Sequence, residues 1–243
     1  MISKNSVLTD YAYTEILRMI LSGEIKHGSR IREDALAKQL EISRTPIREA
    51  VNRLTQNGFI TTIQRKGLYC VKFTRKELLD IIELRITLET LAIEKCIALA
   101  SEEDILRFQM TISEFQEKLE GLHTKEDADS NAMTLLHNEY DIRFHVDIAR
   151  ISTSTRLIQY VSEVENLLLV ARQRIYSNNQ RVEIIKRSWE QHRLMLDAIR
   201  TREKKQACAL LEEHLALMKE TQVNVDYFDE IAEYSEETAF ENV

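Results

Sequence analysis

Three histidines and an aspartate stand on the apolar rows of helices predicted for the C-terminal two thirds of the chain. Asp141 and His145 are one helical turn apart, and His192 and His214 each occupy the centre of a row of apolar residues. A single buried histidine is usually a hydrogen-bonded core residue. Four such groups converging on one apolar interior must pair with one another, hold water or bind a ligand. Imidazoles together with a carboxylate favour a divalent transition metal.

The predicted ligands come from three helices and leave coordination positions open, unlike a closed structural zinc site. We expect zinc in first place, with nickel, manganese or iron as alternatives. His137 lies one turn before Asp141 and is a candidate to orient a ligand, whereas His27 and His123 are expected in loops. No catalytic residue is predicted, because neither HExxH nor a comparable acid–base motif accompanies the ligands.

Two arginines on predicted helices are candidates to bind an anionic ligand. Arg85 falls in line with apolar residues of its helix and could project into the same interior, where a guanidinium would hold a carboxylate bidentately. The alternative is an ion pair between Arg85 and Glu89, one turn apart on one helix. Arg172 is a second candidate of the same kind.

Long helices must position these side chains, since the sequence beyond Phe73 shows helical periods without proline or strand-like alternation. The expected helices are Glu77–Ala98, Glu102–Glu120, Asp129–Ile151, Thr155–Ser177, Arg181–Arg200 and Glu203–Val223. Gly121 is expected to end the second of them, and Asn178 and Asn179 to form the turn before the fifth. Six helices with short turns predict an antiparallel bundle, followed by an acidic tail at 226–243.

The N-terminal third begins with a predicted helix over residues 7–22, followed by two short helices within Glu33–Leu54. The connector Glu41–Ser43 permits only a sharp turn between them. Pro46 fits the first turn of the second short helix, where its missing N–H costs nothing. The candidate nucleic-acid contacts on this helix are Arg44, Thr45, Arg48, Asn52 and Arg53. Arginines at a helix N-terminus suit reading of guanine in the major groove, and the alternative is a solvated basic face.

Two β-prone runs follow, Phe59–Ile63 and Leu68–Val71. Their connector contains Arg65, Lys66 and Gly67, and glycine permits the positive φ of a hairpin turn. Helix, turn, arginine-bearing helix and hairpin form the order of a winged helix-turn-helix. The three connector residues are therefore further candidates to contact DNA.

Charge is divided unevenly along the 243 residues. Residues 1–73 hold 12 Lys and Arg against 7 Asp and Glu, a balance of +5, whereas the remainder has a balance of −12. Only the first part is therefore expected to meet phosphate. Three widely spaced cysteines indicate reduced, mostly buried thiols, and the chain has neither a membrane-spanning run nor an apolar signal core, so we expect a cytoplasmic protein.

The segment SGEIKHGSRIREDALAKQLEISRTPIREAVNRLTQNGFITTIQRKGLYCV is similar to the N-terminal domain of GntR-family transcription regulators, with His27 where the family usually has proline. DIRFH, WEQHRLMLDAI and ACALLEEHL resemble the metal-binding pattern of the FCD effector domain in the FadR-like subgroup. The residues matched are Asp141, His145, His192 and His214. ARISTSTRL departs from the family's usual pattern after His145. The resemblance implies dimerisation and a small organic acid or sugar acid as effector.

The sequence thus predicts a mainly α protein in three parts: a winged helix-turn-helix domain at 1–74, a helical effector and dimerisation domain at 75–225, and the tail. Its expected partners are double-stranded operator DNA, an effector and a second copy of the chain. Two alternatives remain open. One is a metal-dependent hydrolase with a fused DNA-binding head. The other is an architectural DNA binder whose histidines are satisfied internally.

Overall fold

The structure, a computed structural model, describes residues 4–123, 130–172 and 178–223. It separates into two compact units, one built mainly on residues 1–76 and the other on residues 77–165 with 174–225. The predicted boundary between residues 74 and 75 stays a prediction. The expected acidic tail at 226–243 lies outside the described residues.

Three helices form most of the first unit, namely α1 (Lys4–Leu21), α2 (Glu33–Gln39) and α3 (Arg44–Gln56). Apolar residues at helical spacing make α1 and α3 pack on each other, and Ile16, Ile20, Ile47 and Val51 are fully buried. Ser43 is the N-cap of α3 with an extended backbone, although its hydroxyl makes no capping hydrogen bond. Pro46 lies in the first turn, as predicted.

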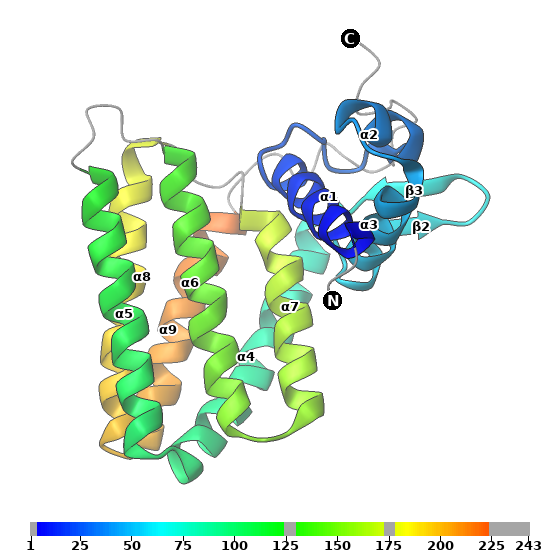
Figure 1. Cartoon of the computed structure of the whole chain (residues 1–243). Helices are drawn as coiled ribbons and strands as arrows, with labels where there is room; N and C mark the ends of the chain where they lie inside the picture. The colour runs from blue at the N-terminus through cyan, green and yellow to red at the C-terminus, as the bar shows by residue number, and fades with distance from the viewer. Residues whose placement is uncertain (1–3, 124–129, 173–177, 224–243) are drawn as a thin grey trace. The chain divides into compact units, whose positions relative to one another are not determined.

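The wing is a three-stranded antiparallel sheet in the order β1-β3-β2. Figure 1 shows the hairpin of β2 and β3. Its strands are β1 (Arg30–Ile31), β2 (Ile60–Ile63) and β3 (Gly67–Cys70). The hairpin pairs Ile63 with Gly67, whose φ of +112° places it where glycine is favoured. The predicted hairpin is therefore confirmed, and β1 is an additional strand that the sequence did not indicate.

Six helices follow, α4 (Arg75–Leu99), α5 (Glu102–His123), α6 (Ser130–Ile151), α7 (Thr155–Arg172), α8 (Asn178–Arg200) and α9 (Lys204–Val223). Of α7, residues 155–165 belong to the second unit. Consecutive helices reverse the chain, so α4, α6 and α8 run in one direction (Figure 1). The predicted fold class, a winged helix-turn-helix followed by a helical bundle, is confirmed.

Three predicted helix ends are wrong by three residues, and the first is the start of α1, which lies at Lys4 instead of residue 7. α5 continues through Gly121, so His123 is its last residue and does not lie in a loop. A glycine costs a helix only about 1 kcal/mol, and Gly121 keeps a negative φ here. α8 begins at Asn178, so the asparagines expected to form a turn lie in its first turn, where such residues are tolerated.

Candidate metal centre and DNA-binding surface

The four predicted ligands come together inside the second unit, from α6, α8 and α9, and all four are buried. One ligand atom of each lies within 4.8 Å of the others. Asp141 Oδ1 lies 3.3 Å from His192 Nε2 and 3.8 Å from His214 Nε2. His145 Nε2 lies 3.1 Å from His192 Nε2 and 3.9 Å from Asp141 Oδ1. The helical spacing read from the sequence thus predicted a real cluster.

Aromatic side chains fix the His192 ring at the centre of the cluster. Phe144 stacks on it with ring centroids 4.4 Å apart, and Trp189 meets it edge-on at 4.7 Å. Trp189 Nε1 in turn donates to His137 Nδ1 at 3.0 Å. Trp189 therefore contacts both His137 and His192.

Hydrogen bonds on the outer ring nitrogens orient two of the imidazoles. His145 Nδ1 lies 2.6 Å from Glu89 Oε2, so it donates to this carboxylate and leaves Nε2 as an acceptor facing the cluster. His214 Nδ1 lies 3.3 Å from Gln191 Oε1, which accepts a hydrogen bond from the ring. His214 Nε2 is buried and has no hydrogen-bond partner among the described residues. Both rings therefore present a lone pair to the interior.

Arg85 belongs to the same interior through a chain of ion pairs. Its Nε lies 2.6 Å from Glu89 Oε1, which is the intrahelical pair considered from the sequence. Its terminal amino group lies 2.5 Å from Glu165 Oε1 and 4.0 Å from Asp141 Oδ2. All four side chains are at most 3% exposed. One guanidinium thus faces three buried carboxylates, and a cation would offset the excess negative charge.

The pKa values follow from this burial and charge. Burial, with smaller repulsion from neighbouring imidazoles, lowers the pKa of His192 and of His214 well below the ordinary histidine value, so both rings are neutral near pH 7. Burial alone would raise the pKa of Glu89, but the charge of Arg85 and the contact with His145 hold it well below its usual range. Neutral imidazoles beside carboxylates are the state in which a metal is bound.

The separations within the cluster suit a single ion. Two nitrogen ligands held about 2.1 Å from zinc are about 3.4 Å apart in a tetrahedral arrangement and about 3.0 Å apart at a right angle. The observed separations of 3.1 to 3.9 Å lie between these values or up to about 0.5 Å above them. Asp141, His145, His192 and His214 therefore fit a divalent transition metal.

On the first unit, α3 turns its predicted nucleic-acid contacts outward. Arg44, Thr45, Arg48 and Asn52 are exposed, opposite the buried face of the helix. Arg53 is exposed too, but it donates to Asp10 at 2.6 Å and lies over the Tyr13 ring at 4.2 Å. These contacts hold Arg53 against α1, away from the row formed by the other four.

The wing carries the predicted basic residues Arg65 and Lys66 and adds Arg30, which the sequence did not single out. Arg65 and Lys66 are exposed at its tip. At its base a hollow of about 380 Å³ is lined by three arginines, together with Gly67. They are Arg30, Arg32 and Arg44. Arg32 donates to Asp34 at 3.2 Å, whereas no carboxylate of the described residues pairs with Arg30. A two-residue strand is too short for alternation to reveal Arg30.

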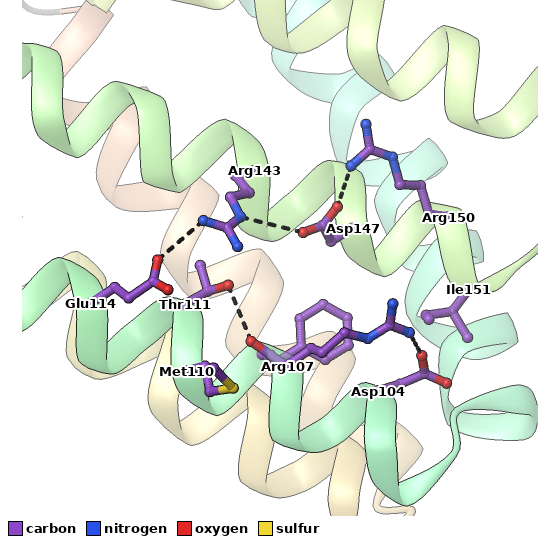
Figure 2. A pocket seen from close by; sticks show the side chains of 10 residues that line it. Asp104, Arg107, Met110, Thr111, Glu114, Arg143, Asp147, Arg150 and Ile151 are labelled. Carbon is purple, nitrogen blue, oxygen red and sulfur yellow. Dashed lines mark hydrogen bonds and ion pairs between the residues drawn. The ribbon is translucent and has the colours of Figure 1, made fainter.

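A second hollow, of about 530 Å³, lies between α5 and α6 (Figure 2). Its three arginines each pair with a carboxylate: Arg107 with Asp104, Arg143 with Glu114 at 3.3 Å, and Arg150 with Asp147 at 2.5 Å. None of the four clustered ligands lines it. Its charges are balanced on the surface, and it is separate from the candidate metal centre.

Glu165 was not predicted, although it completes the pairing of Arg85. It stands four residues after Val161 and three before Leu168, within an apolar row of α7, which was the available signal. The side chain of Arg172 lies outside the described part of the structure, so its predicted role remains a prediction.

Comparison with known proteins matches both units. Residues 8–70 match the bacterial regulatory proteins of the gntR family, and residues 80–217 match the FCD domain. The Nta operon transcriptional regulator of Aminobacter aminovorans is 32% identical over 154 residues, covering 63% of this chain and 68% of that protein. The gluconate operon transcriptional repressor of Bacillus subtilis is 27% identical over 212 residues, covering 84% of this chain and 79% of that protein.

Solved structures agree on the fold. E. coli McbR/YncC superposes with a TM-score of 0.69 at 20% identity, covering 92% of this chain and all of that one. A putative GntR transcriptional regulator from Rhodococcus sp. RHA1 gives a TM-score of 0.65 at 17% identity, covering 88% of this chain and 96% of that one. Among the described helices, none is both long and apolar enough to cross a membrane.

Proposed function

The chain belongs to the GntR family of bacterial transcriptional regulators and carries an FCD domain, and from this we propose that a small organic acid bound at a metal ion in that domain sets its affinity for operator DNA. The family assignment answers the hydrolase alternative, since the similar proteins are transcriptional regulators and not enzymes. The coarse function is thus fixed, and the proposal concerns how the regulator is controlled.

The buried ligand cluster carries the proposal. Asp141, His145, His192 and His214 would hold the ion, and Glu89 would keep His145 oriented toward it. A bound ion supplies a Lewis acid that accepts oxygen ligands from a carboxylate or hydroxyl group. Zinc is the first expectation, with nickel, manganese or iron as alternatives.

An acidic effector suits this interior once the ion offsets its negative charge. Arg85 would then supply a guanidinium for a carboxylate, in competition with Glu165, and Arg172 is proposed as a second contact. The similarity to a gluconate operon repressor supports a sugar acid or a related small acid as the class of effector.

The proposed DNA contacts divide into base reading and phosphate binding. Arg44, Arg48 and Asn52, together with Thr45, would enter the major groove. Arg53, which Asp10 holds against α1, is proposed as a DNA contact beside this row. Arg65, Lys66 and Gly67 would approach the backbone from the wing. We propose a homodimer, because two-fold pairing would place two such helices on a palindromic operator. We also propose that it works in the cytoplasm.

The effector must bind the DNA-bound and DNA-free states with different affinities, and the coupling is reciprocal. The experiment is an operator titration with and without an acid found by thermal-shift screening of small carboxylates and sugar acids. His214→Ala should bind operator normally and lose the response, which in the wild type should correspond to about 1–3 kcal/mol. Equal responses in both proteins would mean that the cluster is structural, as in the architectural alternative.

A further inference from the structure

Two buried polar side chains near the cluster have unused hydrogen-bonding capacity. Asn138 is 2% exposed, and neither its amide nitrogen nor its amide oxygen has a partner among the described residues. Ser188 is 5% exposed, and its Oγ is likewise without a partner there. Burying such groups unpaired is unfavourable, so each requires a ligand or water.

Both residues lie on helices that contribute to the cluster. Asn138 precedes Asp141 by three residues on α6, and Ser188 precedes His192 by four on α8, so each shares a helical face with a predicted ligand. α6 and α8 run in the same direction (Figure 1), and the Trp189–His137 hydrogen bond fixes them alongside each other. Asn138 and Ser188 therefore lie on the same side of the cluster, about one helical turn toward the N-terminal ends.

Arg85 belongs to the same layer. It stands four residues before Glu89 on α4, which runs in the direction of α6 and α8, and Glu89 contacts His145 in the cluster. The layer next to the ligands thus contains a guanidinium, an amide and a hydroxyl. A guanidinium only donates, whereas an amide and a hydroxyl both donate and accept.

We propose that Asn138 and Ser188 read the hydroxyl groups of the effector, so that the regulator responds to hydroxy acids in preference to the same acids without hydroxyls. The inference rests on the proposed function and specifies its ligand class. A bare carboxylate only accepts hydrogen bonds and would leave the Asn138 amide oxygen unfilled. A hydroxyl fills both the donor and the acceptor of the amide, and sites built this way reject analogues that lack the group.

The test is calorimetric binding of two matched pairs of probes, lactate against propionate and gluconate against hexanoate, to the metal-loaded full chain. In at least one of the two pairs, the wild type should bind the hydroxylated acid with about tenfold or more higher affinity than the acid without hydroxyls. Asn138→Leu and Ser188→Ala should each reduce that preference while the metal content, measured separately, stays unchanged. Ser162→Ala is the matched control, because the Ser162 hydroxyl is already bonded to the Ile158 carbonyl oxygen.

The outcomes separate this inference from the proposed function. If acids bind without preference, or if the preference survives in both variants, the subsite is wrong while metal-site sensing stands. If no acid binds the metal-loaded protein, the proposed effector class fails as well. A more stable Asn138→Leu with an unchanged preference would show that the amide is satisfied by water. Should Asn138→Leu fail to fold, Ser188→Ala decides, since it removes a single hydroxyl.

Discussion

His145 and Glu89, on α6 and α4, are joined by a 2.6 Å contact between the imidazole Nδ1 and the carboxylate Oε2. The same carboxylate group receives Arg85 Nε on its other oxygen at 2.6 Å. Glu89 therefore fixes the ring that faces the cluster and is itself fixed by a guanidinium. These contacts connect His145 on α6 with Arg85 on α4.

Removing the charge of Glu89 should weaken metal binding without removing a ligand. We expect Glu89→Gln to lower metal affinity about 10-fold to 100-fold, because His145 loses the carboxylate that orients it and raises its basicity. Competition with a chromophoric chelator measures the change. Glu83→Gln, on the exposed side of the same helix, is the control and should match the wild type.

The purified protein should contain about one divalent transition metal ion per chain. Chelation should lower the melting temperature while the bundle stays folded, since its apolar rows remain. The loss should be about 3 kcal/mol where free metal had been about 100-fold above its dissociation constant. Elemental analysis and calorimetry test this on wild type, on His192→Ala and on the control His27→Ala. A metal-free protein that takes up no zinc, nickel or manganese would refute the site.

Base reading and phosphate binding should separate by mutation. Arg44→Ala and Arg48→Ala should each cost about 1–3 kcal/mol of preference for operator over random DNA. Lys66→Ala at the wing tip should weaken binding to both and reduce the salt dependence. Fluorescence anisotropy at several salt concentrations measures both quantities. Equal losses on operator and random DNA for Arg48→Ala would contradict base reading by α3.

Arg30 at the base of the wing should be a phosphate contact. Arg30→Ala should weaken binding to all sequences and lower the salt slope by about 1, because one cation fewer displaces counterions. Arg32→Ala should have a smaller effect, since Asp34 already pairs with Arg32 at 3.2 Å. The same anisotropy series compares them. A larger effect for Arg32 than for Arg30 would reverse the assignment.

The cysteines should differ in reactivity. Burial, with a smaller effect of Asp104, raises the pKa of Cys96 to about 12, so its thiol stays protonated and unreactive at pH 8. Burial also raises the pKa of Cys208, but this residue is only partly buried. Alkylation followed by mass spectrometry should therefore label Cys208 first and label Cys70 and Cys96 only on unfolding. Early labelling of Cys96 would contradict its burial.

The sequence predicted the ligand cluster well because helical periodicity fixes which residues share a face. Asp141 and His145 are a turn apart, and His192 and His214 interrupt apolar rows, so their convergence followed from the bundle. The partners of Arg85 were harder to predict from the sequence. Glu89 was visible as an intrahelical pair, but the approach of Glu165 depends on how α7 packs against α4, which local spacing does not determine.

The errors in the fold have similar causes. Gly121 and Asn178 were expected to lie outside helices, yet α5 continues through Gly121 and α8 begins at Asn178, because the local preference is worth only about 1 kcal/mol. β1 was missed because Arg30 and Ile31 form a strand only by pairing with Tyr69 and Leu68 of the hairpin. Long-range pairing of this kind leaves no periodic trace in a two-residue segment.

The donor set of the cluster, three imidazoles and one carboxylate, has a consequence for which ion the regulator would bind. Affinity of such nitrogen and oxygen sites generally rises from manganese through iron, cobalt and nickel to copper. The concentrations of free metal ions in the cell would therefore determine which ion binds the cluster. Protein purified over immobilised nickel would contain nickel taken up from the resin. Untagged protein from cells grown with a defined metal supply would instead contain the ion that it binds in the cell.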